Sequence, residues 1–200
     1  MEELALLRPP ACLERILQRT SEIGFAMASE TRTGAILRAL AASKPAGRLL
    51  ELGTGTGVGT AWLRDGMDSL SQLISVDPDA AVQRVARDAF AGDPRVVLLT
   101  EDADSFLSRQ PHASFDLVFA DAMAGKYENL EKALAVVRAG GFYIVDDLLP
   151  QANWPDGHAP RVPALIRELT AHPEFTAVPI EWASGLVVAV RTSPSIPSRW

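Results

Sequence analysis

The chain has 200 residues, of which 48% are hydrophobic and 22% charged, a balance typical of a globular domain and not of a disordered or fibrous protein. Its single cysteine, Cys12, excludes an intrachain disulfide and a cysteine-based zinc site, and the net charge of −6 disfavours a surface that follows nucleic-acid phosphates. There is no apolar run of the ~20 residues that cross a bilayer, and the N-terminus does not resemble a signal peptide. We therefore expect one soluble, cytoplasmic domain over residues 1–200, with no nucleic-acid or membrane partner.

Apolar runs and helical segments alternate along most of the chain. Residues 1–45 contain two predicted helices, at 11–23 and 29–43, and predicted strands follow at 48–52, 72–76, 95–99, 115–120 and 142–145. Helices are predicted between these strands, the last of them at 127–139, closed by Gly140 and Gly141. After a polar loop come a helix near 162–171, two strands at 174–182 and 184–192 joined by a short turn, and a loose tail at 192–200. This order predicts an α/β fold: a Rossmann-like, doubly wound, seven-stranded sheet, mostly parallel with an antiparallel last strand, and helices on both faces.

A glycine-rich turn, ELGTGTGVGT at 51–60, follows the first strand. The spacing of Gly53, Gly55 and Gly57 does not fit the G-x-G-x-x-G of a dinucleotide-binding turn, and the chain contains no G-x-x-x-x-G-K-[ST] phosphate loop. Glu51 precedes the glycines, and Asp77 ends the next strand 24 positions after Gly53. This arrangement suits a small nucleoside without phosphates, because a carboxylate can accept hydrogen bonds from both ribose hydroxyls. Taken alone, the glycines are also typical of an ordinary turn, and the aspartate of a helix cap.

Three aspartates follow the fourth and fifth predicted strands. Asp121 comes directly after 115–120, and Asp146 and Asp147 come directly after 142–145. Because parallel strands end at one edge of a sheet, these carboxylates should lie together beside the glycine turn. Their mutual repulsion requires either raised pKa values or a neutralising cation, and a divalent ion such as Mg²⁺ prefers oxygen ligands. We therefore expect a metal site at Asp121, Asp146 and Asp147, or, alternatively, a carboxylate cluster that receives a cationic amine.

Three further segments carry a family resemblance: FAMASETRTGAIL at 25–37, VFADAMAGKY at 118–127 and GGFYIVDDLL at 140–149. With the glycine turn, they resemble the class I S-adenosylmethionine (SAM)-dependent methyltransferases, and within them the cation-dependent catechol/caffeoyl-CoA O-methyltransferase family. The resemblance runs from about Met27 to about Arg191. It implies SAM and a divalent cation as cofactors, a homodimer, and these SAM-binding residues: Met27, Glu51, Gly53, Thr54, Gly55, Thr56, Gly57, Asp77, Pro78, Asp102, Ala103 and Asp121. Asp102 would accept from the adenine amine, but it is also placed to cap a helix.

The chain departs from the family pattern at two positions. The family's basic lysine is replaced by Ala124, and its metal-binding asparagine by Asp147. The nearest amine is Lys126, which the sequence places at an exposed helix start, and His158 in the polar loop is the other candidate base. We expect Asp121, His158 and Lys126 to be the catalytic residues.

Three functions stay open from the sequence. The first is a SAM-dependent O-methyltransferase that acts, with a divalent cation, on a small and possibly catechol-like substrate. The second is a metal-independent methyltransferase of an amine or hydroxyl. The third is a catalytically silent SAM-binding module, which the missing lysine at Ala124 favours.

Overall fold

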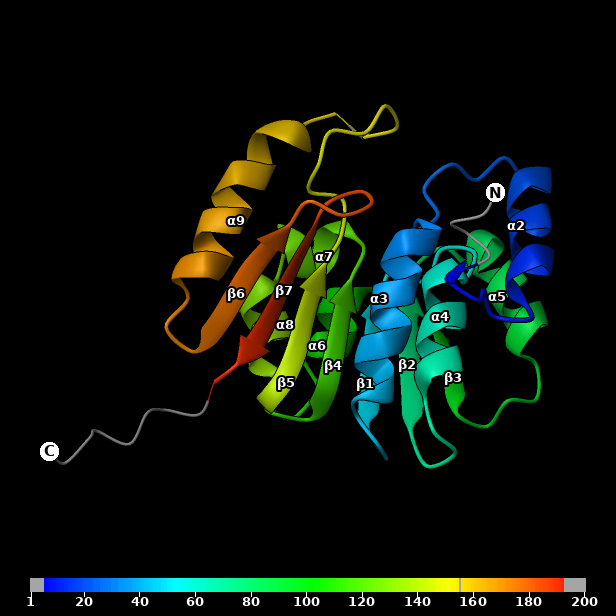
Figure 1. Cartoon of the computed structure of the whole chain (residues 1–200), viewed down its shortest axis with the longest axis horizontal. Coiled ribbons are helices and arrows are strands. Elements are labelled where there is room, and N and C mark those ends of the chain that lie inside the picture. The colour runs from blue at the N-terminus through cyan, green and yellow to red at the C-terminus, as the bar shows by residue number, and fades with distance from the viewer. Residues whose placement is uncertain (1–5, 155, 193–200) are drawn as a thin grey trace, which may run out of the picture.

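A computed structural model, drawn in Figure 1, describes residues 6–154 and 156–192. One seven-stranded sheet has the order β3-β2-β1-β4-β5-β7-β6. β7 pairs antiparallel with both of its neighbours, and all other pairs are parallel, so the predicted fold class is confirmed. The strands are β1 (Arg48–Leu52), β2 (Gln72–Asp77), β3 (Val96–Thr100), β4 (Phe115–Ala120), β5 (Val137–Val145), β6 (Phe175–Ile180) and β7 (Leu186–Arg191).

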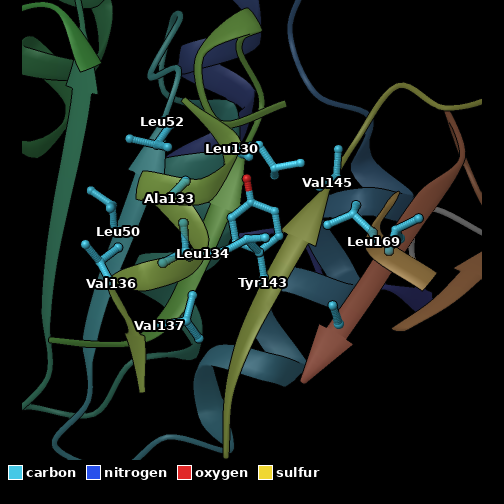
Figure 2. Packing of buried hydrophobic residues seen from close by; sticks show 14 of the residues in the cluster. Leu50, Leu52, Leu130, Ala133, Leu134, Val136, Val137, Tyr143, Val145 and Leu169 are labelled. Atoms are coloured by element: carbon cyan, nitrogen blue, oxygen red, sulfur yellow. The ribbon is translucent and has the colours of Figure 1, made fainter. Parts of the chain in front are cut away.

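Helices cover both faces of the sheet because apolar side chains alternate along the central strands. In β1, Leu49 packs with one buried cluster, which includes side chains of the N-terminal helices, α4 and α5, whereas Leu50 and Leu52 pack with a second cluster, which includes side chains of α6, α8 and α9. Figure 2 shows the second cluster, in which the ring of Tyr143 stands among aliphatic side chains of β1, β5 and α8. The helices are α2 (Leu13–Glu22), α3 (Thr31–Ala42), α4 (Val58–Gly66), α5 (Ala80–Phe90), α6 (Ala103–Leu107), α7 (Met123–Lys126), α8 (Leu130–Ala135) and α9 (Val162–Ala171), the last preceded by the 3₁₀ turn η1 (Ala159–Arg161).

The predicted helix at 127–139 is wrong in its second half. α8 ends at Ala135, and the chain enters β5 at Val137, which pairs with Phe115 of β4 and is fully buried. Gly140, expected to close the helix, lies inside the strand at φ +75°, next to an irregularity in the β4–β5 register. Sheet pairing and burial of Val137 therefore outweigh the helical periodicity of this segment. The other predicted strands agree with the structure to within two residues at each end.

The strand order reverses between β1 and β4, which are neighbours in the sheet although five other elements separate them in the chain. The turns that follow these strands meet at the carboxyl edge, where doubly wound folds bind their ligands. None of the helices in the described ranges is long and apolar enough to cross a membrane. The predicted tail lies, from residue 193 onward, outside the described residues.

Candidate active site

The glycine turn between β1 and α4 presses against the turn that follows β4. Gly53 has φ +99°, and a Cβ atom on it would lie 2.5 Å from the carbonyl oxygen of Asp121. Its N–H donates to the carbonyl of Val76 at 2.9 Å. Only glycine tolerates both the left-handed backbone and this close approach, so the glycine at 53 is what lets the two turns share one site.

Asp77, at the end of β2, faces this turn. One carboxylate oxygen accepts from the N–H of Gly55 at 2.8 Å, and the other accepts from the N–H of Asp79 at 2.9 Å. A carboxylate has about four acceptor positions, so two remain for a ligand. Asp77 therefore orders the glycine turn and still offers acceptors to a pair of hydroxyl groups.

A cavity of about 270 Å³ opens between the glycine turn, Asp77 and the segment before α3. Eight of the predicted SAM-binding residues line it: Met27, Gly53, Thr54, Gly55, Thr56, Asp77, Pro78 and Asp121. Seven lining residues were not singled out from the sequence, namely Phe25, Ala28, Ser29, Val58, Gly59, Ala122 and Met123. Phe25, Ala28 and Ser29 flank Met27, so the resemblance at this segment contained a signal for them.

Glu51, Gly57, Asp102 and Ala103 do not line the cavity. Gly57 is the N-cap residue of α4, at φ +93°. Asp102 caps α6, since one carboxylate oxygen accepts from the N–H of Ser105 at 3.0 Å. Ala103 is buried behind it. The capping alternative for Asp102 is thus observed, while its second oxygen stays available for a ligand.

Glu51 supports the turn from beneath. Its Oε2 accepts from the hydroxyls of Thr60 and Ser75, the latter at 2.5 Å, and its Oε1 is buried without a hydrogen-bond partner among the described residues. Burial raises the pKa of Glu51 to about 8, although the two hydroxyls act in the opposite direction. The raised pKa brings the change of charge of Glu51 near neutral pH, directly beneath the glycine turn.

Lys126 lies between the aspartates and not in solvent. Its Nζ is 3.3 Å from Asp121 Oδ1 and 3.5 Å from Asp147 Oδ2, and only 3% of its side chain is exposed. The expectation of an exposed lysine at a helix start is therefore wrong. The cause is Gly125, whose φ of +86° breaks α7 and turns the following residue inward.

Asp146 makes its hydrogen bonds with groups outside the Lys126–Asp121 ion pair. Its Oδ1 accepts from the N–H of Asp147 at 2.8 Å, from the hydroxyl of Thr33 at 3.4 Å and from the hydroxyl of Ser184. Ser29 donates to Asp121 Oδ2 at 2.8 Å. Thr33 and Ser184 were not predicted as partners of the aspartates, because they come from elements far away in the sequence.

Burial and close contact between the charged groups shift the pKa values of the aspartates and of Lys126. Burial raises the pKa of Asp121 to about 6 against the opposing effect of Lys126, and burial together with the neighbouring carboxylates raises the pKa of Asp146 to about 7. Burial by itself would lower the pKa of Lys126, but the carboxylates raise it, so the amine stays protonated. Two effects therefore reduce the repulsion between the carboxylates: their pKa values are raised, and a cation, the Lys126 ammonium, lies beside them.

The predicted metal ligands do not fit a metal ion. Within the described part of the chain, no three His, Cys, Asp or Glu side chains are arranged to hold one. Asp121 and Asp147 point to the Lys126 ammonium, and Asp146 to Ser184 and Thr33.

A second, smaller cavity of about 70 Å³ adjoins the first. It is lined by Met27, Ala28, Ser29, Glu30, Asp121, Asp147, Gln151, Asn153, Trp154 and Ser184. Met27, Ala28, Ser29 and Asp121 line both cavities. The polar loop after β5 is joined to the segment before α3, since Asn153 donates to the carbonyl of Ala26 at 2.8 Å.

His158 lines neither cavity. It is 3% exposed, and its Nε2 lies 2.9 Å from the carbonyl of Asp147 and 3.2 Å from the hydroxyl of Tyr127. Its ring packs on Trp154, with the centroids 4.5 Å apart. His158 thus fixes the loop against the sheet edge, and the structure does not bring it to the cavity walls.

Comparison with known proteins bears on the family and the fold of the chain. Residues 50–148 match the family described as a methyltransferase domain. A protein of Mycolicibacterium vanbaalenii named "Putative O-methyltransferase" is 31% identical over 184 residues, which cover 87% of this chain and 81% of the relative. A protein of Klebsiella pneumoniae with the same description has a crystal structure that matches with a TM-score of 0.79 at 26% identity and covers 94% of this chain and 93% of that one. The O-methyltransferase TomG of Streptomyces achromogenes, solved in complex with SAM, matches in fold with a TM-score of 0.78 at 24% identity, over 92% and 90% of the two chains.

The seven-stranded sheet with its antiparallel last strand, and the cavity at the glycine turn, define a class I methyltransferase fold. The similar proteins place the chain in a narrower group within this class. The chain belongs to the SAM-dependent O-methyltransferase family, as the resemblance in its sequence predicted.

Proposed function

We propose that this protein transfers the methyl group of SAM to a hydroxyl group of a small molecule. The observation that carries the proposal is the common wall of the two cavities, which Met27, Ala28, Ser29 and Asp121 form. Ligands in the larger and the smaller cavity would meet beside Asp121. Methyl transfer requires this geometry, because the acceptor oxygen must be aligned behind the methyl group.

The larger cavity suits the nucleoside and amino-acid parts of SAM. The free acceptor positions of Asp77 would receive the two ribose hydroxyls, and the turn at 53–56 would hold the amino-acid part. The free oxygen of Asp102 would accept from the adenine amine. When bound, SAM supplies a methyl group that its sulfonium already makes strongly electrophilic.

Asp121 is the best-placed proton acceptor for the substrate hydroxyl. Its carboxylate lines both cavities, and burial brings its pKa close to neutral, where a general base is most effective. Lys126 stays protonated, so its part is to hold the charge and position of Asp121. His158 is the alternative base, but its ring nitrogen is engaged by the carbonyl of Asp147.

The smaller cavity favours a neutral or cationic phenol as the substrate. Glu30, Asp121 and Asp147 give its wall a negative character, and none of the described residues that line it is a lysine or arginine. Trp154 offers an aromatic surface to a planar ring. A catechol meets these requirements, and so does a phenol that carries an amine. Assistance by Mg²⁺, which the sequence led us to expect, would require the Lys126 ammonium to leave its position between Asp121 and Asp147.

The test is a radiolabelled methyl-transfer assay with a mixed panel of phenols, run beside calorimetry of SAM binding. We expect labelled product with the wild type. In Asp121→Asn, transfer should fall by about 100-fold while SAM affinity stays within a few-fold, because the acceptor would be lost and the main cofactor anchors kept. SAM binding without transfer to any acceptor would favour the catalytically silent module instead.

A further inference from the structure

We infer that the ammonium of Lys126 takes the place of a divalent cation at the carboxyl ends of β4 and β5, so that this protein works without a metal ion. The part of the inference that concerns catalysis rests on the proposed methyl transfer. The part that concerns metal exclusion stands on the arrangement of the side chains alone.

The first observation is the position of the ammonium. Lys126 Nζ lies within 3.5 Å of carboxylate oxygens of both Asp121 and Asp147, which follow two neighbouring strands. A cation bridging these carboxylates would need the same space. A divalent ion would also be repelled by the lysine charge at short range in a poorly solvated position.

The second observation is that Lys126 is held in place by its backbone. The preceding residue, Gly125, donates its N–H to the carbonyl of Glu128 at 2.7 Å and accepts from the hydroxyl of the buried Tyr143. A Cβ atom at Gly125 would lie 2.8 Å from Leu52 Cδ1, so the backbone sits tightly against β1. Lys126 therefore follows a tightly packed turn, and its side chain is buried and not a flexible surface side chain.

The third observation concerns the remaining carboxylate. Asp146 is 1% exposed, and its Oδ1 receives donors from Asp147, Thr33 and Ser184. Asp146 therefore links the end of β5 to α3 and to the turn before β7 through hydrogen bonds. Asp121 and Asp147 are thus the two carboxylates that make ion pairs with the Lys126 ammonium, and no group of three metal-holding side chains is found within the described residues.

These contacts make Lys126 a positioning residue. It lines neither cavity, whereas Asp121 lines both, so the lysine acts on the reaction through the aspartate. Asp147, which stands where the family pattern has an asparagine, adds a negative charge to the cluster, and Lys126 makes an ion pair with it. Together they give the cluster an internal counter-ion.

Binding of Mn²⁺, measured by electron paramagnetic resonance, tests the inference without any substrate. Wild type should leave millimolar Mn²⁺ free, as should Lys126→Arg, which keeps the charge. Lys126→Met should bind about one ion per chain, because it removes the counter-ion and leaves carboxylate oxygens that suit such an ion. Lys132→Met is the matched control: it removes a half-exposed lysine paired with Asp104 and should behave as wild type.

Two results would overturn the inference. One is wild-type binding of Mn²⁺ at micromolar concentration that Asp121→Asn abolishes. The other is a folded Lys126→Met that still leaves Mn²⁺ free. If Lys126→Met does not fold, the wild-type and Lys126→Arg measurements decide the question. Methyl transfer by wild type should change less than about twofold in a chelator; a lack of transfer under every condition would instead refute the proposed function and leave the Mn²⁺ result standing.

Discussion

Asp77→Ala should weaken SAM binding far more than it weakens the fold. In the structure, the Asp77 carboxylate accepts one backbone N–H on each oxygen, from Gly55 and Asp79, and keeps about two acceptor positions free. Asp77 lines the cavity beside the glycine turn, where these positions could receive the ribose hydroxyls. The variant removes both acceptors for the ribose and also releases the N–H of Gly55, so the turn itself would be less ordered before binding.

The magnitude follows from the charge on the acceptor. Hydrogen bonds to a charged group contribute about 1.5–3 kcal/mol, more than bonds between neutral groups. Loss of the carboxylate should therefore raise the dissociation constant for SAM by roughly 10- to 100-fold. The released N–H groups belong to Gly55, which is half-buried, and to Asp79, which is exposed, and both can bond to water instead. We therefore expect only a small loss of folding free energy.

Titration calorimetry with SAM measures this directly, and Asp79→Ala is the matched control. Asp79 caps α5 by accepting from the N–H groups of Ala81 and Val82, and it does not line the cavity. Its loss should cost about 0.5–2 kcal/mol of folding stability and leave SAM affinity nearly unchanged. Wild-type affinity in Asp77→Ala, or equal losses of affinity in both variants, would remove Asp77 from the cofactor site.

Three further predictions concern the turns and the cofactor. Gly125→Ala should lower the free energy of unfolding by about 2–4 kcal/mol in urea titration, because it places an alanine at a left-handed φ and brings its Cβ against Leu52. The control Gly92→Ala has the same φ but open space around it, so it should cost about 1–2 kcal/mol. Equal losses in the two variants would contradict the tight packing at Gly125. The pKa of Glu51 is about 8 in the folded state and about 4.5 in the unfolded one, so the native state binds more protons between these values and stability should fall as pH rises from 4.5 to 8. Glu51→Gln should remove part of that slope, and an unchanged slope would show that Glu51 does not titrate there. NAD should not displace SAM in a competition experiment; displacement would show that the glycine spacing had been misinterpreted.

The parts of the fold that depend on local patterns could be predicted from the sequence. The apolar runs gave the strands, and the glycines with Asp77 indicated the binding edge, because short-range chemistry fixes a turn after a strand. The helix at 127–139 was wrong because Val137 contributes to a helical pattern as well as to a strand, and only its pairing with Phe115 decides between the two. Local sequence contains no information about that partner.

The electrostatics of the site depend on contacts between distant segments. Lys126 appeared exposed because nothing in its neighbourhood indicated that Gly125 would take φ +86° and turn the side chain inward. The burial of His158 against Trp154 and Tyr127 likewise depends on how a long loop folds back. Thr33 and Ser184 reach Asp146 across 113 and 38 positions of the chain. The sequence could therefore predict which carboxylates gather at the sheet edge, but not which cation meets them.

The most direct test of the proposed function is to follow the methyl group. Wild-type protein would be incubated with SAM labelled with ¹³C in its methyl group and with the phenol that is most active in the panel, and the product examined by carbon–proton correlation spectroscopy. We predict that the label appears in a methyl group bonded to the former hydroxyl oxygen, together with an equal amount of demethylated cofactor. Label on nitrogen or carbon, or no demethylated cofactor although SAM binds, would contradict transfer to oxygen at this site.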